Sequence, residues 1–566
     1  MILINHLNTK AVLLILASQL FITGCNIETT TDDETIVEVS DDTTTDTTTD
    51  DDSTTDDDST TDDDSTTDDD STTDDDSTAD DDTSVTVIDI TDIDNVDTVV
   101  EISLDDSSST IIEAYEESDT SSNTVGLTLN SNASYNGYTL FAPMGDSDTY
   151  LIDNCGELVY TWPSDYKSKS TYILENGYLL HAGTVGNTVF TSGGAMTGII
   201  EMINSDGEVV WDYELSSTTE TMHHDIEYIE ETGTILALVW EVYSGDDAET
   251  AGRTSYGSTI WTERVIEIQP DIENGTAEII WEWNVWDHLV QDENASAENY
   301  GVVADHPELV NLNFTYSDAT SADWLHMNAV DYNADLDQIL ISSRNFSEFW
   351  IIDHSTTTEE AASHEGGTYG KGGDLLYRWG NPQTYDQGDD SDQMLFVQHN
   401  ANWIDEDYAD GGSIMVFNNQ AGNAYDEDYS SVDVIDTGVN EDGSYDLDGE
   451  VFGPSSATWS YIADEPTDFY AENISGANRL PNGNTLINEG TTGTIFEVTY
   501  YGDIVWEYIN PISSTGTLTQ GSTASNNRLF RALRYSTDYV GLEDYDLTPD
   551  GTIEYSSSYS CDLYSD

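Results

Sequence analysis

Residues 206–213 have the sequence Asp-Gly-Glu-Val-Val-Trp-Asp-Tyr, a Gly-containing turn followed by an apolar run that ends in aromatic residues. β-Branched and aromatic residues after a turn signal are typical of a strand. The same pattern recurs along the chain at 155–162, 276–283, 373–379 and 501–508. Five such endings predict that the same kind of sheet occurs several times along the chain.

A second recurring unit, a tight hairpin, lies between these endings. It occurs at 174–180, 231–236 and 480–487, where Asn-Gly or Thr-Gly supplies the turn. Pairs of paired strands are the unit of a β-propeller blade. One more hairpin at 410–416 lacks a clean aromatic ending and raises the expected number of blades to six. Long insertions at 241–260 and 421–470 make the spacing irregular, which excludes a WD40 or Kelch array. We therefore predict an all-β, six-bladed propeller.

The first 25 residues have the features of a lipoprotein-type signal peptide. Lys10 precedes an apolar run over 11–17, which is too short to span a membrane comfortably, and Ile-Thr-Gly comes directly before Cys25. A small residue before Cys at the end of such a run resembles the bacterial lipobox, in which the Cys becomes lipidated. The alternative is a plain secretory peptide that contains a Cys. We expect an exported protein that is lipid-anchored in the cell envelope, on the periplasmic side or at the cell surface.

Three further segments follow the signal. Residues 53–82 are five copies of a six-residue Ser-Thr-Thr-Asp-Asp-Asp unit, the last with Ala79 in place of Thr, so 26–83 is expected to be a disordered acidic tether. Short runs of alternating Val and Ile then predict a small β module over 84–135. Residues 136–566 are expected to form the propeller and to contain the catalytic site.

The charge of the chain limits its partners. Of 566 residues, 12 are basic and 114 acidic, a net charge of −102. This charge excludes nucleic acid, and it excludes an anionic membrane except through a lipid anchor. A negatively charged substrate must therefore meet a positive site that is built locally.

Four histidines begin strands in equivalent positions: the His223-His224 pair, His326 and His399. The first strand of a propeller blade lines the central channel, so three blades would direct imidazoles at one point. Any one of them alone would more often be a structural, hydrogen-bonded His. The remaining histidines considered, which lie in polar stretches and are expected in exposed loops, are His288, His306, His354 and His364.

Arg344 adds a fourth position to these three strand openings, since it lies on the partner strand of the hairpin that begins at His326. In a chain with so few cations, an Arg among Ser and Asn on an inner strand is better explained by an anion than by a surface ion pair. A guanidinium beside imidazoles disfavours a three-His metal centre, because cation would oppose cation. We expect no metal there and a site for an oxyanion.

Seven motifs together resemble the bacterial arylsulfate sulfotransferase family. They lie at 138–143, 151–162, 222–225, 325–328, 342–344, 398–399 and 530–535, and the resemblance spans about residues 135–545. It implies a six-bladed propeller that moves a sulfuryl group from an aryl sulfate donor to a phenolic acceptor, without the phosphoadenosine cofactor or any other. It also implies that His399 is the nucleophile and that the positions of His326, Asn328, Arg344 and His223-His224 hold sulfate oxygens or assist proton transfer.

Two assignments around this site stay open in the sequence. Alternation along a strand points His223 and His224 to opposite faces, and the register favours His224 as the one that lines the channel. Thr491 and Thr492 would add a hydroxyl from the last blade, unless they are ordinary strand threonines.

Better-known members of the family have a disulfide near the catalytic site, whereas here only Cys155 and Cys561 remain beside Cys25. An exported pair would join the first blade to the C-terminal segment. Two other functions compete with sulfuryl transfer: a non-catalytic surface propeller that binds carbohydrate or protein, and a metal-dependent lyase or oxygenase. The sequence does not fix the physiological donor, the acceptor or the oligomeric state, for which a homodimer is one option.

Overall fold

The computed structural model describes residues 122–554 except 192–193, 317–319 and 426, and also Cys561. Before residue 122 it describes the backbone of four short strands only. The predicted signal peptide with the predicted lipidation site at Cys25, and the acidic repeats at 53–82, lie outside the described residues. The chain divides into two units, 1–114 and 115–566.

The first unit contains two antiparallel hairpins. β1 (Asn26–Thr29) pairs with β2 (Val37–Ser40), and β3 (Val100–Asp105) pairs with β4 (Ser108–Ile112). The first hairpin falls in the stretch predicted as disordered tether, and the second falls in the predicted β module. No described helix of the chain has the length and apolar character needed to cross a membrane.

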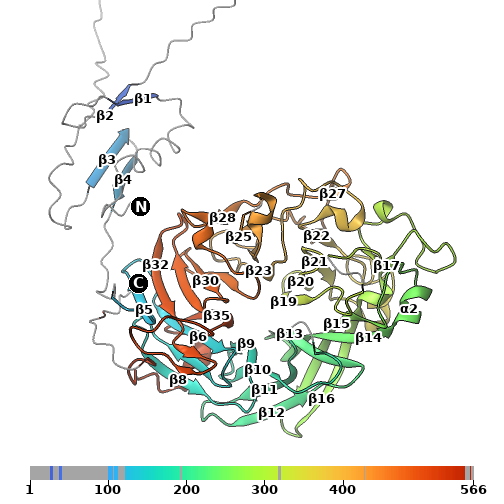
Figure 1. The fold of residues 1–566 in the computed structure, drawn as a ribbon, viewed down its shortest axis with the longest axis horizontal. Coiled ribbons are helices and arrows are strands. Elements are labelled where there is room, and N and C mark those ends of the chain that lie inside the picture. Colours follow the sequence, from blue (N-terminus) through green and yellow to red (C-terminus); the bar gives the residue numbers. More distant parts are fainter. Residues whose placement is uncertain are drawn as a thin grey trace, which may run out of the picture. The chain divides into compact units, whose positions relative to one another are not determined.

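The second unit is a six-bladed β-propeller, which confirms the predicted fold class (Figure 1). From the innermost strand outward, blade one is β35 (Leu529–Ser536), β6 (Gly137–Pro143), β7 (Thr149–Ile152) and β8 (Leu158–Trp162). Blade two is β9 (Ser168–Ile173), β10 (Leu179–Thr184), β11 (Gly198–Ile203) and β12 (Val209–Glu214). Blade three is β13 (Glu220–Ile229), β14 (Thr234–Ser244), β15 (Thr259–Asp271) and β16 (Thr276–Asn284).

The second half of the ring follows the same order. Blade four is β19 (Met327–Asn333), β20 (Gln338–Ser343), β21 (Glu348–Asp353) and β22 (Tyr377–Trp379). Blade five is β23 (His399–Trp403), β24 (Ile414–Asn418), β25 (Ser431–Ile435) and β28 (Trp459–Tyr461). Blade six is β29 (Gly476–Arg479), β30 (Thr485–Glu489), β31 (Thr494–Val498) and β32 (Ile504–Ile509), with β5 (Gly126–Asn130) added at its outer edge.

Short elements occupy the connections between these strands. The helices are α2 (Gly245–Thr250), α3 (Thr358–Ala361), η1 (Val285–Asp287), η2 (Val303–Asp305), η3 (Pro382–Tyr385), η4 (Ala421–Tyr425), η5 (Pro466–Asp468) and η6 (Val540–Leu542). The two-residue strands are β17 (Leu289–Val290), β18 (Val310–Asn311), β26 (Leu447–Asp448), β27 (Val451–Phe452), β33 (Ile512–Ser513) and β34 (Gly516–Thr517).

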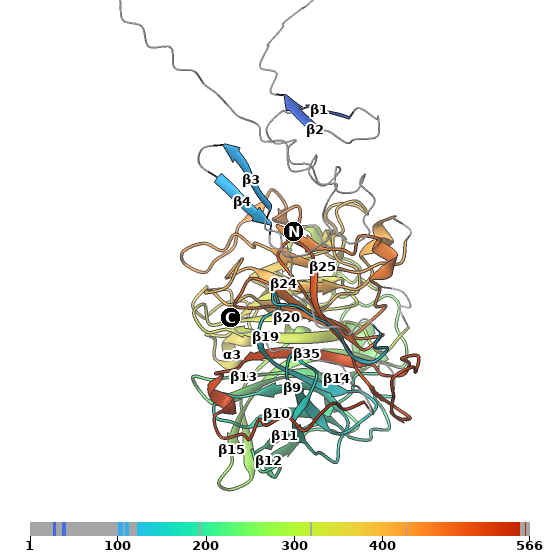
Figure 2. The same ribbon diagram turned by 90° about the vertical axis from the view of Figure 1, so that its left-hand side faces the viewer.

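The two ends of the propeller sequence close the ring. β35, the last long strand, pairs antiparallel with β6 and becomes the innermost strand of blade one, beside β9 in the side view (Figure 2). At the other edge of the closure, β5 pairs with β32. The predicted start of the propeller at 136 is therefore too late, because β5 already belongs to blade six. Cys155, at the turn before β8, forms a disulfide with Cys561 and adds a covalent link to this closure.

The aromatic endings of the sequence are the fourth strands of five blades, counted from the innermost strand: β8, β12, β16, β22 and β32. Blade five has an aromatic outer strand as well, Trp459-Ser-Tyr461, which the sequence did not reveal. The connection from β25 to β28 is long and contains β26 and β27. In the sequence, β28 is therefore far from the hairpin at 410–416 from which blade five was predicted.

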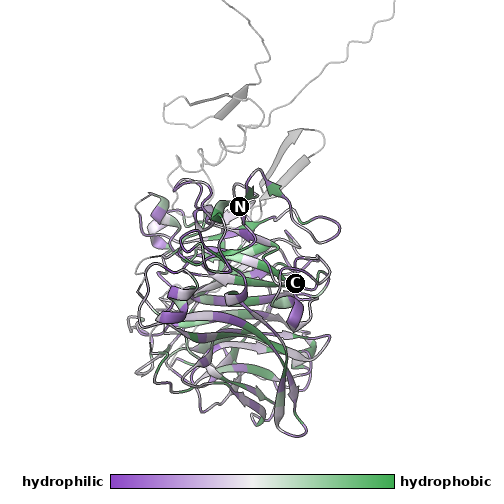
Figure 3. Cartoon of the chain, turned by 90° about the vertical axis from the view of Figure 1, so that its right-hand side faces the viewer, coloured by the Kyte–Doolittle hydropathy of each residue, from purple (hydrophilic) through white to green (hydrophobic). Residues whose placement is uncertain are grey.

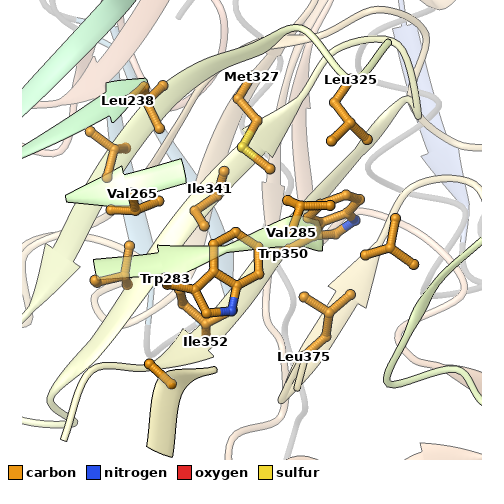
Figure 4. Packing of buried hydrophobic residues seen from close by; sticks show 14 of the residues in the cluster. Leu238, Val265, Trp283, Val285, Leu325, Met327, Ile341, Trp350, Ile352 and Leu375 are labelled. Atoms are coloured by element: carbon orange, nitrogen blue, oxygen red, sulfur yellow. The ribbon is translucent and has the colours of Figure 1, made fainter. Parts of the chain in front are cut away.

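Each pair of adjacent blades encloses one hydrophobic cluster, so six clusters form the core of the propeller. Between blades three and four, Leu238 and Trp283 pack against Met327 and Trp350 (Figure 4). Hydrophobic residues follow the strands of the sheets, and the connecting loops are largely hydrophilic (Figure 3). Burial of each large apolar side chain contributes about 1.5–3 kcal/mol to the stability of the fold. The packed ring holds the first residues of the innermost strands in fixed positions.

Candidate active site

A cavity of about 430 Å³ opens where the innermost strands of the blades begin. Blades one, three, four, five and six each contribute side chains to its wall, and the β10–β11 loop of blade two contributes Ala195. Its polar lining includes His224, Asp323, His326, Arg344, His399 and Arg528. The site therefore joins residues that are more than 300 positions apart in the chain.

The backbone at these strand openings departs from regular β geometry. His224, His326, Asn400 and Ile474 all have left-handed φ angles, of +52°, +53°, +52° and +53°. Next to the first three, pairing with the second strand shifts register, between 222 and 226, 327 and 329, and 399 and 402. Such bulges redirect side chains, and strained φ values are typical of functional sites. Strict strand alternation therefore does not hold at His223 and His224, and of this pair only His224 lines the cavity.

Five titratable side chains form one continuous hydrogen-bonded chain at the cavity. His223 Nε2 lies 2.7 Å from a Glu263 carboxylate oxygen, and His223 Nδ1 lies 2.8 Å from His224 Nδ1. His224 Nε2 lies 3.1 Å from His326 Nε2, and His326 Nδ1 lies 2.6 Å from Asp323 Oδ2. His224 and His326 line the cavity, whereas His223 lies behind them, stacked on Trp240.

The two ends of this chain differ in their affinity for a proton. Burial raises the pKa of Glu263 well above its ordinary value. Burial also acts on Asp323, but the charge and the hydrogen bond of His326 outweigh it, so the pKa of Asp323 falls below its ordinary value. Burial lowers the pKa of His223 to about 3, and burial followed by the other histidines lowers that of His224 well below its ordinary value. Of the two carboxyl groups, Glu263 therefore holds a proton more readily than Asp323 does.

The hydrogen-bond inventory then allows two arrangements of the same protons. In the first, Glu263 donates to His223, His223 to His224, His224 to His326, and His326 to Asp323. In the second, each of the three bonds from Glu263 to His326 is reversed, and His326 is an imidazolium. Moving one proton along the chain converts the first arrangement into the second. The chain can therefore deliver a proton to, and accept one from, the Nε2 atoms that face the cavity.

His399 has a fixed tautomer. The Asn419 amide nitrogen donates to the carbonyls of Ala471 and Ile474, at 2.9 and 2.8 Å, so its oxygen faces His399 Nδ1, at 2.7 Å. His399 Nδ1 must then carry the proton, and the backbone N–H of Ile474, 3.2 Å from Nε2, donates to the remaining lone pair. Burial, followed by Arg344, lowers the pKa of His399 well below its ordinary value. The imidazole is therefore neutral, and its lone pair is on Nε2, which faces the Ile474 N–H.

Arg344 supplies positive charge on the wall beside His399. It follows β20 directly, and its backbone N–H donates to the His326 carbonyl at 3.2 Å. Its guanidinium donates to Asn345 Oδ1 at 2.9 Å and lies 6.0 Å from the centroid of the Tyr316 ring. Within the described part of the chain it forms no ion pair with a carboxylate, so its other N–H groups remain for a ligand.

More of the scarce cations gather around this cavity. Arg253 and Arg528 line it, although Arg253 already donates to the carbonyls of Ser255 and Leu312. Lys169, buried on β9, interacts electrostatically with His224. Burial, followed by Lys167 and Arg528, lowers the pKa of Lys169 to about 8. In a chain of net charge −102, this concentration of positive charge marks an anion site.

The wall of the cavity also has an aromatic side. Tyr316, Trp324 and Phe530 line it, and the Phe530 ring centroid lies 6.1 Å from that of His224. Aromatic side chains of this kind pack against aryl ligands in offset or edge-to-face geometry. The cavity thus offers an aryl surface next to an oxyanion site.

Three predicted binding residues lie outside the cavity wall. Asn328 is buried, and its amide nitrogen donates to the Gln398 carbonyl at 2.7 Å, so it supports the backbone that precedes His399. Thr491 and Thr492 lie in the turn between β30 and β31, where the Thr492 hydroxyl bonds to the Glu489 carbonyl at 3.0 Å. Asn328 thus contacts the site only through the backbone before His399, and neither threonine lines the cavity.

The sequence missed three residues that organise the site: Asp323, Glu263 and Asn419. Asp323 precedes His326 by only three residues, so the sequence near His326 could have revealed it. Glu263 lies on β15, where polar and apolar residues alternate as in an ordinary strand, and Asn419 directly follows β24. Their partners lie 40 and 20 residues away in the chain, so only the sheet pairing brings them together.

The histidines expected in exposed loops divide into two groups. His306 and His364 have side chains that are 41% and 58% exposed, as predicted. His288 is buried instead, beside Asp374, and His354 is half-buried between Glu267 and Asp337. His181, which the sequence analysis left unassigned, is buried on β10 beside Glu201 at 3.0 Å.

One cavity of this six-bladed propeller thus joins a neutral imidazole, a guanidinium that has no carboxylate partner among the described residues, a hydrogen-bonded series of histidines and an aryl surface, as expected of an anion site. The profile of the arylsulfotransferase (ASST) family matches residues 117–524. The chain belongs to this family. Its class of reaction is therefore aryl sulfotransfer, with an aryl sulfate as donor and a phenol as acceptor.

Other comparisons add no functional information. A comparison with curated proteins gives no significant match. Among solved structures, a protein of unknown function from Bacteroides caccae is 11% identical with a TM-score of 0.36, over 70% of this chain and 98% of that chain. A streptogramin B lyase is 11% identical with a TM-score of 0.33, over 75% of this chain and 98% of the lyase. Likenesses this weak support no argument.

Proposed function

We propose that this protein transfers a sulfuryl group in two half-reactions through a covalent intermediate on His399 Nε2. The donor is an aryl sulfate and the acceptor is a phenol. The observation that carries the proposal is the tautomer of His399: Asn419 holds the proton on Nδ1, so the lone pair is on Nε2, which exchanges its hydrogen bond from the Ile474 N–H for the sulfur of the donor. A neutral imidazole with a fixed lone pair is a competent nucleophile near neutral pH.

In the first half-reaction, His399 Nε2 attacks the sulfur of the donor. The new N–S bond forms while the bond from sulfur to the aryl oxygen breaks, and the electron pair of that bond leaves with the phenolate. The shared proton between His224 and His326 passes to the leaving oxygen, and the chain draws its replacement from Glu263. Arg344 donates to the sulfuryl oxygens, on which negative charge stays concentrated.

The second half-reaction runs the same steps backward with a different aryl group. The hydroxyl proton of the acceptor returns to the His224 and His326 nitrogens, and the phenol oxygen attacks the sulfur. The S–N bond breaks, and its electron pair returns to Nε2 of a neutral His399. One cavity serves both aryl groups in turn, so donor product must leave before the acceptor binds.

Steady-state kinetics with 4-nitrophenyl sulfate and a phenol acceptor test this proposal. We expect turnover that depends on the acceptor and gives parallel double-reciprocal lines. Intersecting lines would exclude the covalent intermediate. A complete lack of turnover over a range of donors and acceptors would favour a non-catalytic binding propeller.

In the pH profile of kcat/KM for the donor, the acid limb should have its midpoint at a lower pH than the ordinary pKa of a His. Burial and Arg344 place the folded-state pKa of His399 below its usual 6.5, so the imidazole stays neutral through pH 6.5 and gains a proton only at more acidic pH. For the donor, kcat/KM reports the first half-reaction only, and the acceptor phenol does not affect it. We expect kcat/KM to be level from pH 7 to 6.5 and to fall with a midpoint below 6.5. A midpoint at or above 6.5 would contradict the environment described for His399.

The Glu263→Gln variant should be selectively slow with donors that have poor leaving groups. The Gln side chain keeps a hydrogen bond to His223 but cannot supply the mobile proton. Loss of general acid catalysis costs about 10²–10⁴-fold, so we expect that range for phenyl sulfate and a much smaller loss for 4-nitrophenyl sulfate, whose phenolate leaves without a proton.

Glu267→Gln is the matched control for this variant. Glu267 lies on the same strand, β15, and is likewise buried against a His, with His354 Nε2 at 3.1 Å, but it is outside the cavity. This variant should leave the dependence on the leaving group unchanged. An equal loss for both donors in Glu263→Gln would remove Glu263 from the proton chain.

A further inference from the structure

A second cluster of ligating side chains lies at the junction of blades three and four, away from the cavity. His288 ends the short η1 helix after β16, and His364 and Asp374 lie in the connection between α3 and β22. One ligand atom from each of these three side chains lies within 4.8 Å of the others, and among the described residues this is the one such group of His, Cys, Asp and Glu. None of the three lines the cavity.

Both imidazoles direct the same ring atom at one carboxylate oxygen. His288 Nδ1 lies 2.8 Å from Asp374 Oδ1, and His364 Nδ1 lies 2.7 Å from the same oxygen. The two rings are nearly perpendicular, with an interplanar angle of 88°. Two nitrogens and one carboxylate oxygen therefore converge from different segments on a single point.

The other nitrogen of His288 decides what Nδ1 can do. Nε2 lies 2.7 Å from the Ala361 carbonyl, which only accepts hydrogen bonds, so Nε2 carries a proton. In a neutral ring Nδ1 then has a lone pair and no proton, and it faces Asp374 Oδ1, which is also an acceptor. A cation bound between these two acceptors would remove their mutual repulsion. A ring N–H donated to a backbone carbonyl is also the usual support of a histidine that ligates a metal.

The surroundings hold His288 rigidly in this orientation. Its ring is fully buried and stacks on Trp283 at 9°, and Trp283 Nε1 donates to the Gly373 carbonyl at 2.7 Å. A Cβ on Gly373 would lie 2.6 Å from His288 Nε2 and 2.1 Å from the Ala361 carbonyl oxygen, so only glycine permits this approach. The carboxylate of Asp287 interacts electrostatically with His288 and His364 and adds negative charge nearby.

We propose that His288, His364 and Asp374 bind a divalent ion of the Zn²⁺ type that ties blade three to the insertion of blade four. Two imidazole nitrogens and one carboxylate suit Zn²⁺ rather than Ca²⁺ or Mg²⁺, which take oxygen ligands. Three protein ligands leave a fourth position for water, which the exposed side of His364 makes accessible. The ion is structural, because its ligands lie outside the cavity.

The test is a titration of the full-length protein with Zn²⁺ after treatment with a chelator. The many acidic side chains bind divalent ions weakly, so the buffer contains excess Mg²⁺ and Ca²⁺ to occupy them. We expect one equivalent of Zn²⁺ to bind tightly by calorimetry and to raise the thermal unfolding midpoint. Co²⁺ should bind the same site and give a visible absorption band that Zn²⁺ abolishes.

Two variants assign the site. His364→Ala removes an exposed ligand with little risk to folding, and Asp374→Asn removes the shared carboxylate. Each should weaken Zn²⁺ binding by about 100-fold or more and abolish the Co²⁺ band, without changing aryl sulfate turnover. His306→Ala is the matched control, because His306 is also exposed and paired with one carboxylate, Glu308 at 2.9 Å. It should bind Zn²⁺ like the wild type.

Two outcomes would overturn the proposal. One is a wild-type protein that takes up no equivalent of Zn²⁺ in the presence of Mg²⁺ and Ca²⁺. The other is tight binding that neither His364→Ala nor Asp374→Asn affects. In both cases the cluster is an imidazolium ion pair with Asp374. If Asp374→Asn does not fold, the His364→Ala variant still decides between these outcomes.

Discussion

The His399→Ala variant should lose sulfuryl transfer by about 10⁴-fold or more, the largest effect expected of any substitution in this cavity. The reason is geometric. Asn419 fixes the tautomer of His399 alone, whereas His224 and His326 share a proton with each other and point their Nε2 atoms at one another. The other two imidazoles of the cavity wall share their Nε2 atoms with each other, so neither has a fixed tautomer with which to replace the nucleophile.

His326→Ala is the informative comparison for this variant. His326 assists proton transfer in our account, so its removal should slow both half-reactions but still allow a labelled His399 to accumulate after a pulse of donor. Both variants should retain the wild-type unfolding midpoint within a few degrees, so that a loss of activity is not a loss of fold. If His399→Ala turned over as fast as His326→Ala, His399 would not be the nucleophile.

The Arg344→Lys variant should lose about 2–4 kcal/mol of transition-state stabilisation, equivalent to about 30- to 1,000-fold in kcat/KM for the donor. Lys keeps the positive charge, but it loses the planar pair of N–H donors that matches two sulfuryl oxygens. The guanidinium is already oriented by Asn345 and by the Tyr316 ring, so its remaining donors need little reorganisation.

Arg528→Lys is the matched control for Arg344→Lys. Arg528 also lines the cavity, but its side chain is 43% exposed and lies 3.6 Å from Glu472. Solvent screens its charge, so we expect a change in kcat/KM of about threefold or less. A loss in Arg344→Lys that is no greater than in Arg528→Lys would mean that Arg344 contributes charge only and no directed contact.

The fold was predictable because its signal is repeated. The outer strand of a blade ends in aromatic residues that pack between blades, and this requirement recurs once in each blade. Trp459 and Tyr461 meet it too, but the insertion before them separates them from their blade in the sequence. At the closure of the ring, β35 pairs with β6 and β5 pairs with β32. These pairs join the two ends of the propeller sequence, and no local sequence pattern predicts them.

The candidate site was predictable only in part. The strand-opening histidines and Arg344 were visible because their residue types are rare in this chain and their positions are equivalent. The bulges that direct His224 and His326 into the cavity break the alternation on which a strand prediction depends. Glu263 and Asn419 act on histidines that belong to other strands of the same blade, so their roles exist only once the sheets have formed.

The most direct test of the account is to find the sulfuryl group on the protein. The wild-type protein is mixed briefly with an aryl sulfate in the absence of acceptor, quenched, and examined by intact-protein and peptide mass spectrometry. The account predicts the added mass of one sulfuryl group, located on His399 and discharged by a phenol. A label on His326, His224 or His223, or a protein that turns over with no label at all, would contradict it.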